Sequence, residues 1–167
     1  NMALFVNKHQ GHTKDDEFYT FKEDWIKINQ YIPKNIVVWE AFSNGKYEAV
    51  DYLKSICKEV ITNTGDFFDN NEGDCVITNP PFSIKQKVLK KLKEIDKPFI
   101  CILPTLSLQT KYMKEIFNDE IQVIMPTKKM FFYKYINGEK VIYNKLSYYC
   151  CYVCYKMNLN KDFILLD

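Results

Sequence analysis

A short stretch, Asp74-Cys75-Val76-Ile77-Thr78-Asn79-Pro80-Pro81-Phe82, decides the fold expected of this chain. Its first half is an apolar run typical of a buried strand, and its second half is a proline-rich turn. Residues 84–95 then place apolar side chains at helical spacing, with lysines between them. The chain therefore passes from a buried strand through a rigid loop into an amphipathic helix, the unit from which parallel sheets are built.

The same alternation continues on both sides of this stretch. We expect strands at 36–42, 59–62, 99–103 and 121–125, and helices at 24–31, 47–55 and 110–117. Two last strands lie around Asn137-Gly138 and end in the run 148–156; because that dipeptide favours a hairpin turn, they predict an antiparallel edge. The expected fold class is α/β: a Rossmann-like, doubly wound, seven-stranded, mostly parallel sheet with an antiparallel C-terminal edge.

Length and composition are those of one globular domain. The chain has 167 residues, of which 47% are hydrophobic. We expect a mobile N-terminal segment at 1–16 and a single domain at 17–167, which leaves no room for a separate target-recognition domain. No apolar run approaches the length of a membrane span, and the start lacks the pattern of a secretory signal. The protein is expected to be intracellular, cytoplasmic or nuclear, and not secreted.

Charge and cysteine content narrow the chemistry. The formal net charge is +2, and every basic residue is Lys, so ionic contacts with nucleic acid or phosphate would be point charges without bidentate guanidinium forks. Six cysteines are present, and the cluster Cys150, Cys151 and Cys154 lies inside one strand-like run without a second ligand pair. We therefore expect buried thiols and no metal site.

The tetrapeptide Asn79-Pro80-Pro81-Phe82 carries the chemistry. Each proline holds its predecessor extended and offers no N–H, which leaves a rigid loop rich in acceptors. The Asn79 side-chain oxygen and the Pro80 carbonyl can accept from one NH₂ group, while the Phe82 ring offers a stacking face. Such a loop is suited to alkylation of a planar amine. The alternative is a turn that merely ends a strand, since Asn and Pro favour turns.

These residues resemble the S-adenosylmethionine-dependent amino-group methyltransferases, most closely the N6-adenine DNA methyltransferases, whose tetrapeptide is Asp/Asn-Pro-Pro-Tyr/Phe. The segments Phe18-Tyr19-Thr20, Trp39 to Gly45 and Asp66-Phe67-Phe68 resemble that family's cofactor segments, in an order that the family uses. The resemblance covers about Phe18 to Lys156. It implies a class I methyltransferase fold, S-adenosylmethionine as the cofactor, and catalytic roles for Asn79, Pro80, Pro81 and Phe82.

The resemblance also implies which residues bind the cofactor. They are Tyr19, Thr20, Glu40, Phe42, Asn44, Gly45, Asn63, Asp66, Phe67 and Asn79. Several have a structural alternative: Glu40 could form an ion pair, Asp66 could form a turn, Phe67 could belong to the core, and Tyr19 and Thr20 could cap a helix. The sequence departs from the family pattern in two places, because one glycine remains in the loop after Glu40 and Asn63 stands where an acid is expected.

The resemblance implies methyl transfer to the N6 amine of adenine in DNA. Nucleic acid is the expected partner, with a homodimer or heteromeric partner supplying target recognition, and no membrane. Candidate phosphate contacts are Lys85, Lys87, Lys128, Lys129 and Lys134. Three alternatives stay open: methylation of an RNA base amine, methylation of a protein glutamine, and a catalytically inactive methyltransferase-like subunit of a larger complex. The lysines could equally be a solvated face or an ordinary edge strand.

Overall fold

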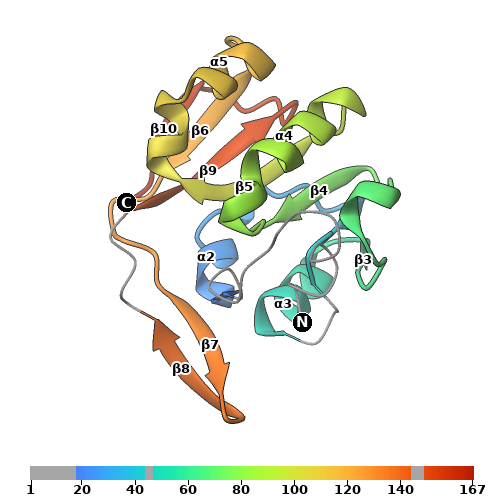
Figure 1. Ribbon diagram of the computed structural model, residues 1–167, viewed down its shortest axis with the longest axis vertical. Helices are drawn as coiled ribbons and strands as arrows, with labels where there is room; N and C mark the ends of the chain where they lie inside the picture. Colours follow the sequence, from blue (N-terminus) through green and yellow to red (C-terminus); the bar gives the residue numbers. More distant parts are fainter. Residues whose placement is uncertain (1–17, 44–46, 144–148) are drawn as a thin grey trace.

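The computed structural model describes residues 18–43, 47–143 and 149–167. Its centre is a seven-stranded sheet in the order β10-β6-β9-β5-β4-β2-β3 (Figure 1). All neighbouring strands are parallel except β9, which is antiparallel to both β5 and β6. The strands are β2 (Val37–Trp39), β3 (Glu59–Ile61), β4 (Cys75–Thr78), β5 (Phe99–Pro104), β6 (Ile121–Met125), β9 (Cys150–Tyr155) and β10 (Phe163–Leu165).

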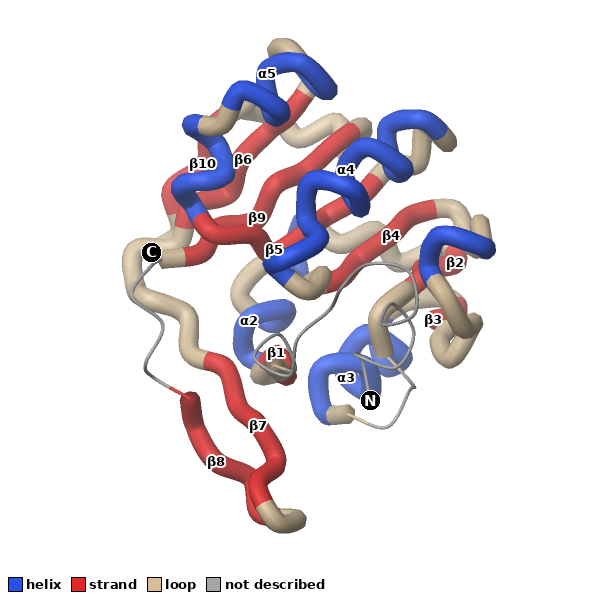
Figure 2. Tube along the Cα trace, viewed as in Figure 1, coloured by secondary structure: helices blue, strands red, loops and turns tan. Residues whose placement is uncertain are grey.

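Helices cover both faces of the sheet (Figure 2). The apolar sides of α4 (Lys85–Glu94) and α5 (Lys111–Phe117) pack on one face, in a cluster that includes Leu89, Leu92 and Phe117. The other face is covered by α2 (Lys22–Ile26) and α3 (Glu48–Ile56), through Trp25 and Leu53. Short 3₁₀ turns lie between these elements: η3 (Asn29–Tyr31), η4 (Phe67–Asp69), η5 (Phe82–Ile84) and η6 (Thr105–Gln109). The α/β fold class expected from the sequence is confirmed.

A second, three-stranded sheet lies beside the first. It has the order β1-β7-β8, with β1 (Tyr19–Thr20) paired to β7 (Phe132–Ile136) and β7 paired to β8 (Glu139–Tyr143). The hairpin turns at Asn137 and Gly138, whose φ angles of 50° and 82° are those the Asn-Gly dipeptide favours. In Figure 1 this hairpin extends away from the main sheet. An ion pair of 2.5 Å between Lys140 and Glu48 ties it to α3.

Several details differ from the sequence prediction. The antiparallel strand β9 lies inside the sheet, and the edge is β10, a parallel strand that the sequence did not predict. All six residues of β9 are buried, which fits an apolar run between two neighbours, whereas much of the hairpin is exposed and pairs only with β1. The helix expected at 24–31 is divided into α2 and η3.

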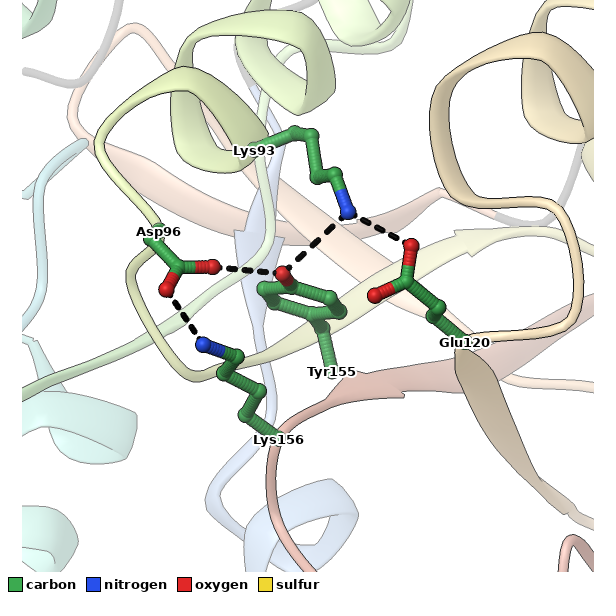
Figure 3. A network of polar contacts seen from close by, with 5 residues as sticks. All are labelled: Lys93, Asp96, Glu120, Tyr155 and Lys156. Atoms are coloured by element: carbon green, nitrogen blue, oxygen red, sulfur yellow. Dashed lines mark hydrogen bonds and ion pairs between the residues drawn. The ribbon is translucent and has the colours of Figure 1, made fainter.

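Polar contacts fix the end of β9 between its neighbours (Figure 3). The Tyr155 hydroxyl donates to Asp96 Oδ1 at 2.6 Å, and Lys156 forms an ion pair with the same carboxylate. Lys93 Nζ donates to Glu120 Oε1 at 2.6 Å and also contacts the Tyr155 oxygen. These contacts lie where β5 and β6 begin, and they hold the antiparallel strand in register.

The cysteines are part of the core. All six are free and buried, and burial raises the pKa of the Cys151 thiol to about 11 and that of Cys150 to about 12. Among the described residues no group of three or more His, Cys, Asp or Glu side chains could hold a metal ion. The described helices include none that is long and apolar enough to cross a membrane.

Gly73 sets how closely β4 approaches β2. Its φ is +65°, and a Cβ there would lie 3.0 Å from the Val37 carbonyl oxygen and 3.2 Å from the Trp39 nitrogen. We predict that Gly73→Ala lowers the free energy of unfolding by about 2–3 kcal/mol, from backbone strain plus crowding. Gly65→Ala is the control. Gly65 also has a positive φ, +83°, but a Cβ there would have no atom of the described residues within 4 Å beyond its chain neighbours, so a loss of only about 1 kcal/mol is expected. Equal losses in urea unfolding would contradict the close approach.

Candidate functional site

The site lies at the carboxyl ends of β2 and β4, where a doubly wound sheet binds its ligands. Because Val38 pairs with Cys75 and Trp39 with Val76, the residues that follow each strand come together. Glu40 follows β2, and Thr78 ends β4 directly before Asn79. The Thr78 hydroxyl donates to Glu40 Oε1, which also accepts from the Phe42 N–H at 3.2 Å. A buried carboxylate thus joins the two strand ends.

Burial determines the protonation of Glu40. The residue is 7% exposed, and removal from water raises the pKa of its carboxyl to about 7. The hydrogen bonds from Thr78 and the Phe42 N–H favour the carboxylate, but they offset only part of that burial effect. Glu40 therefore changes charge near neutral pH, which is unusual for a carboxyl group and typical of functional sites.

Asn79 has one amide end bonded and the other without a partner. Its side chain is buried, with Nδ2 donating to Thr20 Oγ1 at 3.0 Å. Its Oδ1 is buried and has no hydrogen-bond partner among the described residues. Because a buried acceptor without a donor costs about 1–3 kcal/mol, such groups in native proteins point to a bound ligand or a functional role. The strand end thus presents an acceptor ready for an N–H donor.

A small cavity connects these groups. Its volume is about 30 Å³, and five of the residues predicted from the sequence line it: Tyr19, Thr20, Glu40, Phe42 and Asn79. The Tyr19 and Tyr47 rings, which also line it, lie 4.3 Å apart with their hydroxyls 3.2 Å apart. A space of this size holds water and not a nucleoside, so a larger ligand requires these side chains to move.

Three predicted cofactor residues lie away from the cavity. Phe67 is fully buried, and its ring centre lies 5.3 Å from that of Trp39 and 4.9 Å from that of Phe42. Asp66 begins the η4 turn and accepts from the Phe68 N–H at 2.9 Å. Asn63 is exposed with φ 57°, and its N–H donates to the Ser43 carbonyl. The predictions for Asn44 and Gly45 lie outside the described residues.

The tetrapeptide is continuous with the core. Pro80 and Pro81 are buried, and Pro81, at φ −57° and ψ 127°, is extended and precedes the η5 turn. Phe82 is half-buried, with its ring edge-on to that of Phe132 at 6.2 Å. Phe82 is therefore anchored against the strand that pairs with β1, beside the Asn79 end of the site.

The five predicted phosphate-binding lysines divide into two groups. Lys85 and Lys87 lie in the first turn of α4, where Lys85 Nζ donates to the Phe82 carbonyl at 3.2 Å and Lys87 is exposed. Lys128 and Lys129 precede β7; Lys128 is exposed, and Lys129 Nζ lies 5.9 Å from the centre of the Tyr149 ring. Lys134 lies on β7, and its Nζ is 4.4 Å from the centre of the Phe18 ring and 4.9 Å from the centre of the Tyr143 ring.

The sequence reasoning missed Thr78 and Tyr47. Thr78 is a polar residue at the end of an otherwise apolar strand, so its position beside the tetrapeptide was an available signal. Tyr47 directly precedes α3 and carries no pattern that distinguishes it from an ordinary core tyrosine.

No family model matches the chain, and no curated protein matches it. Among solved structures, the chain is similar to a provisionally assigned RNA methyltransferase from Pyrococcus horikoshii, with 17% identity and a TM-score of 0.46, over 78% of each chain. It is also similar to precorrin-6y C5,15-methyltransferase from Geobacter metallireducens, with 13% identity and a TM-score of 0.46, over 84% of this chain and 92% of the other. Likenesses of this size identify no substrate, so an acceptor has to be inferred from the site itself.

The raised pKa of Glu40 predicts a pH-dependent stability. The folded protein holds the Glu40 proton up to about pH 7, whereas the unfolded chain releases it near 4.5, so Glu40 makes the fold less stable as pH rises through that window. The total loss is on the order of 3 kcal/mol. Glu40→Gln removes this titration while keeping an acceptor for Thr78. Between pH 5 and pH 8, the free energy of unfolding measured in urea should fall less for the variant than for the wild type. An equal fall in both proteins would contradict the raised pKa of Glu40.

Proposed function

We propose that this chain transfers the methyl group of S-adenosylmethionine to the exocyclic N6 amine of adenine in DNA. The observation that carries the proposal is the buried Asn79 Oδ1, which has no partner within the described protein and lies at a strand end beside a buried carboxyl. An acceptor without a donor is what an amine nucleophile needs, because its N–H groups must be held as its lone pair is freed.

Asn79 and its loop would act on the acceptor amine. Asn79 Oδ1 and the Pro80 carbonyl accept the two amine hydrogens, while Phe82 stacks on the planar ring. The half-buried ring of Phe82 and its anchoring against Phe132 support this role, since a stacking platform has to be held in place. Catalysis would then be mainly alignment of the amine with the methyl group, without a covalent enzyme intermediate. The N–C bond would form as the methyl–sulfur bond breaks, S-adenosylhomocysteine would leave, and solvent would take the proton released from the amine.

Glu40 and its neighbours would hold the cofactor. S-adenosylmethionine supplies an electrophilic methyl group on a sulfonium cation. Once the lining side chains move apart, a carboxylate beside Tyr19, Thr20 and Phe42 would attract a cationic ligand, because the ligand offsets the cost of burying the negative charge. Asn63, Asp66 and Phe67, which follow β3 in the chain, complete the proposed cofactor set together with Asn44 and Gly45. Cofactor binding favours ionised Glu40, so affinity should rise as pH increases through about 7.

DNA would reach the site through lysine point charges. Lys85 and Lys87 lie directly after the tetrapeptide, and Lys128, Lys129 and Lys134 lead into the hairpin that pairs with β1. A target base has to leave the stack to reach a strand-end site, so single-stranded or mismatched DNA should be the easier substrate. A second copy or another chain would supply sequence recognition.

The proposal is tested by incubating the protein with methyl-labelled S-adenosylmethionine and separate pools of duplex DNA, single-stranded DNA, RNA and protein. Label should enter DNA as N6-methyladenine, faster in single strands. Label in RNA or on glutamine would show that the acceptor is not DNA, although the reaction would still be methyl transfer to an amino group. A lack of transfer to every pool, together with no cofactor binding, would support the inactive-subunit alternative.

Asn79→Ala is the variant that isolates the acceptor. We predict a loss of transfer of about 10²-fold or more, because the group removed acts on the reacting amine, while cofactor affinity stays within about threefold. Asn79→Asp is the matched control, since it keeps an acceptor at the same place, and it should retain most of the activity. Unchanged turnover in the alanine variant would remove Asn79 from the mechanism.

A further inference from the structure

We propose that Thr20 is a positioning residue that fixes which end of the Asn79 amide faces the acceptor. The inference rests on the proposed function, since it explains how Asn79 is made ready for an amine. It adds a role for Thr20 that is separate from cofactor contact.

The need for such a residue follows from the chemistry of an amide. One end of the Asn79 side chain donates and the other accepts, and a half-turn about the last bond exchanges the two. If the NH₂ end faced an amine nucleophile, two sets of donors would meet and no lone pair would be freed. In a buried site with little water, the orientation has to come from a neighbouring side chain.

Thr20 supplies that neighbour. Its Oγ1 accepts from Asn79 Nδ2 at 3.0 Å, with its own hydroxyl hydrogen directed away from this amide, and Oδ1 is then the atom without a partner among the described residues. Both residues line the same cavity. The bond joins residues 59 positions apart in the chain, so local backbone geometry does not impose it.

The second sheet holds Thr20 in place. β1 pairs with β7, and Thr20 lies opposite Phe132, the residue whose ring meets Phe82. A β-branched side chain on a paired strand has few rotamers, which keeps the hydroxyl aimed at Asn79. The acceptor loop is therefore oriented by β1, a strand that belongs to the second sheet and not to the main one.

A double-mutant cycle tests the orientation directly. An aspartate at 79 has two equivalent acceptor oxygens and needs no orienting partner, so Thr20 should matter for Asn79 and much less for Asp. We expect Thr20→Val to lower kcat about 10- to 100-fold in the Asn79 protein, measured at saturating S-adenosylmethionine so that a change in cofactor affinity does not enter kcat. In the Asn79→Asp background the same change should cost less than about threefold. Thr20→Ser, which keeps the hydroxyl, should restore most of kcat.

Thr110→Val serves as a matched control. Thr110 Oγ1 accepts from the Met113 N–H at 3.3 Å and caps α5, so its loss lowers stability without touching the site. This variant should show a lower melting temperature and unchanged kcat. Equal fold-losses for Thr20→Val in the Asn79 and Asp backgrounds would overturn the positioning role, because a structural defect does not depend on residue 79.

An NMR readout separates this inference from the proposed function. The side-chain NH₂ of Asn79 should exchange its hydrogens slowly in the wild type, and at least about tenfold faster in Thr20→Val, because the bonded hydrogen is released. Unchanged exchange would overturn the positioning role even if the enzyme is active. Faster exchange in a protein that methylates no substrate would support the orientation of Asn79 by Thr20 and overturn the proposed function.

Discussion

The hydrogen bond between the Thr78 hydroxyl and the Glu40 carboxyl is the interaction on which the site depends. It joins the carboxyl ends of β2 and β4 at the point where both chains leave the sheet, and it puts a group that titrates near neutral pH inside the protein. Asn79 follows Thr78 directly. The bond between Thr78 and Glu40 therefore also helps to fix the position of the Asn79 side chain. The fold tolerates a buried carboxyl here because two donors offset part of its desolvation.

The second side of the site comes from outside the main sheet. The three-stranded sheet β1-β7-β8 brings Tyr19 and Thr20 over the strand ends, and the ion pair between Lys140 and Glu48 ties its hairpin to α3. The same hairpin region holds three of the lysines proposed for DNA. These three lysines and the residue proposed to orient the acceptor thus lie on or next to one small sheet.

How far the sequence predicted the structure depended on how local each signal was. The strand before Asn79 and the hairpin at Asn137-Gly138 follow from short patterns, and both are confirmed. The internal place of β9 and the edge strand β10 depend on long-range pairing, which no local period records. The five lining residues that were predicted came from a resemblance, because Tyr19 and Glu40 have no distinctive spacing of their own. The Thr20–Asn79 hydrogen bond joins residues 59 positions apart, so no local sequence pattern could predict it.

The measurement that tests the central claim most directly is the pKa of Glu40, followed by carbon-13 NMR of its carboxyl with and without S-adenosylmethionine. In the free protein the carboxyl should titrate at about pH 7, because burial favours its neutral form. On binding, the cationic cofactor should stabilise the carboxylate and lower that pKa by at least about one unit. A Glu40 that titrates near 4.5 when free, or whose pKa does not respond to the cofactor, would contradict the site described for this chain.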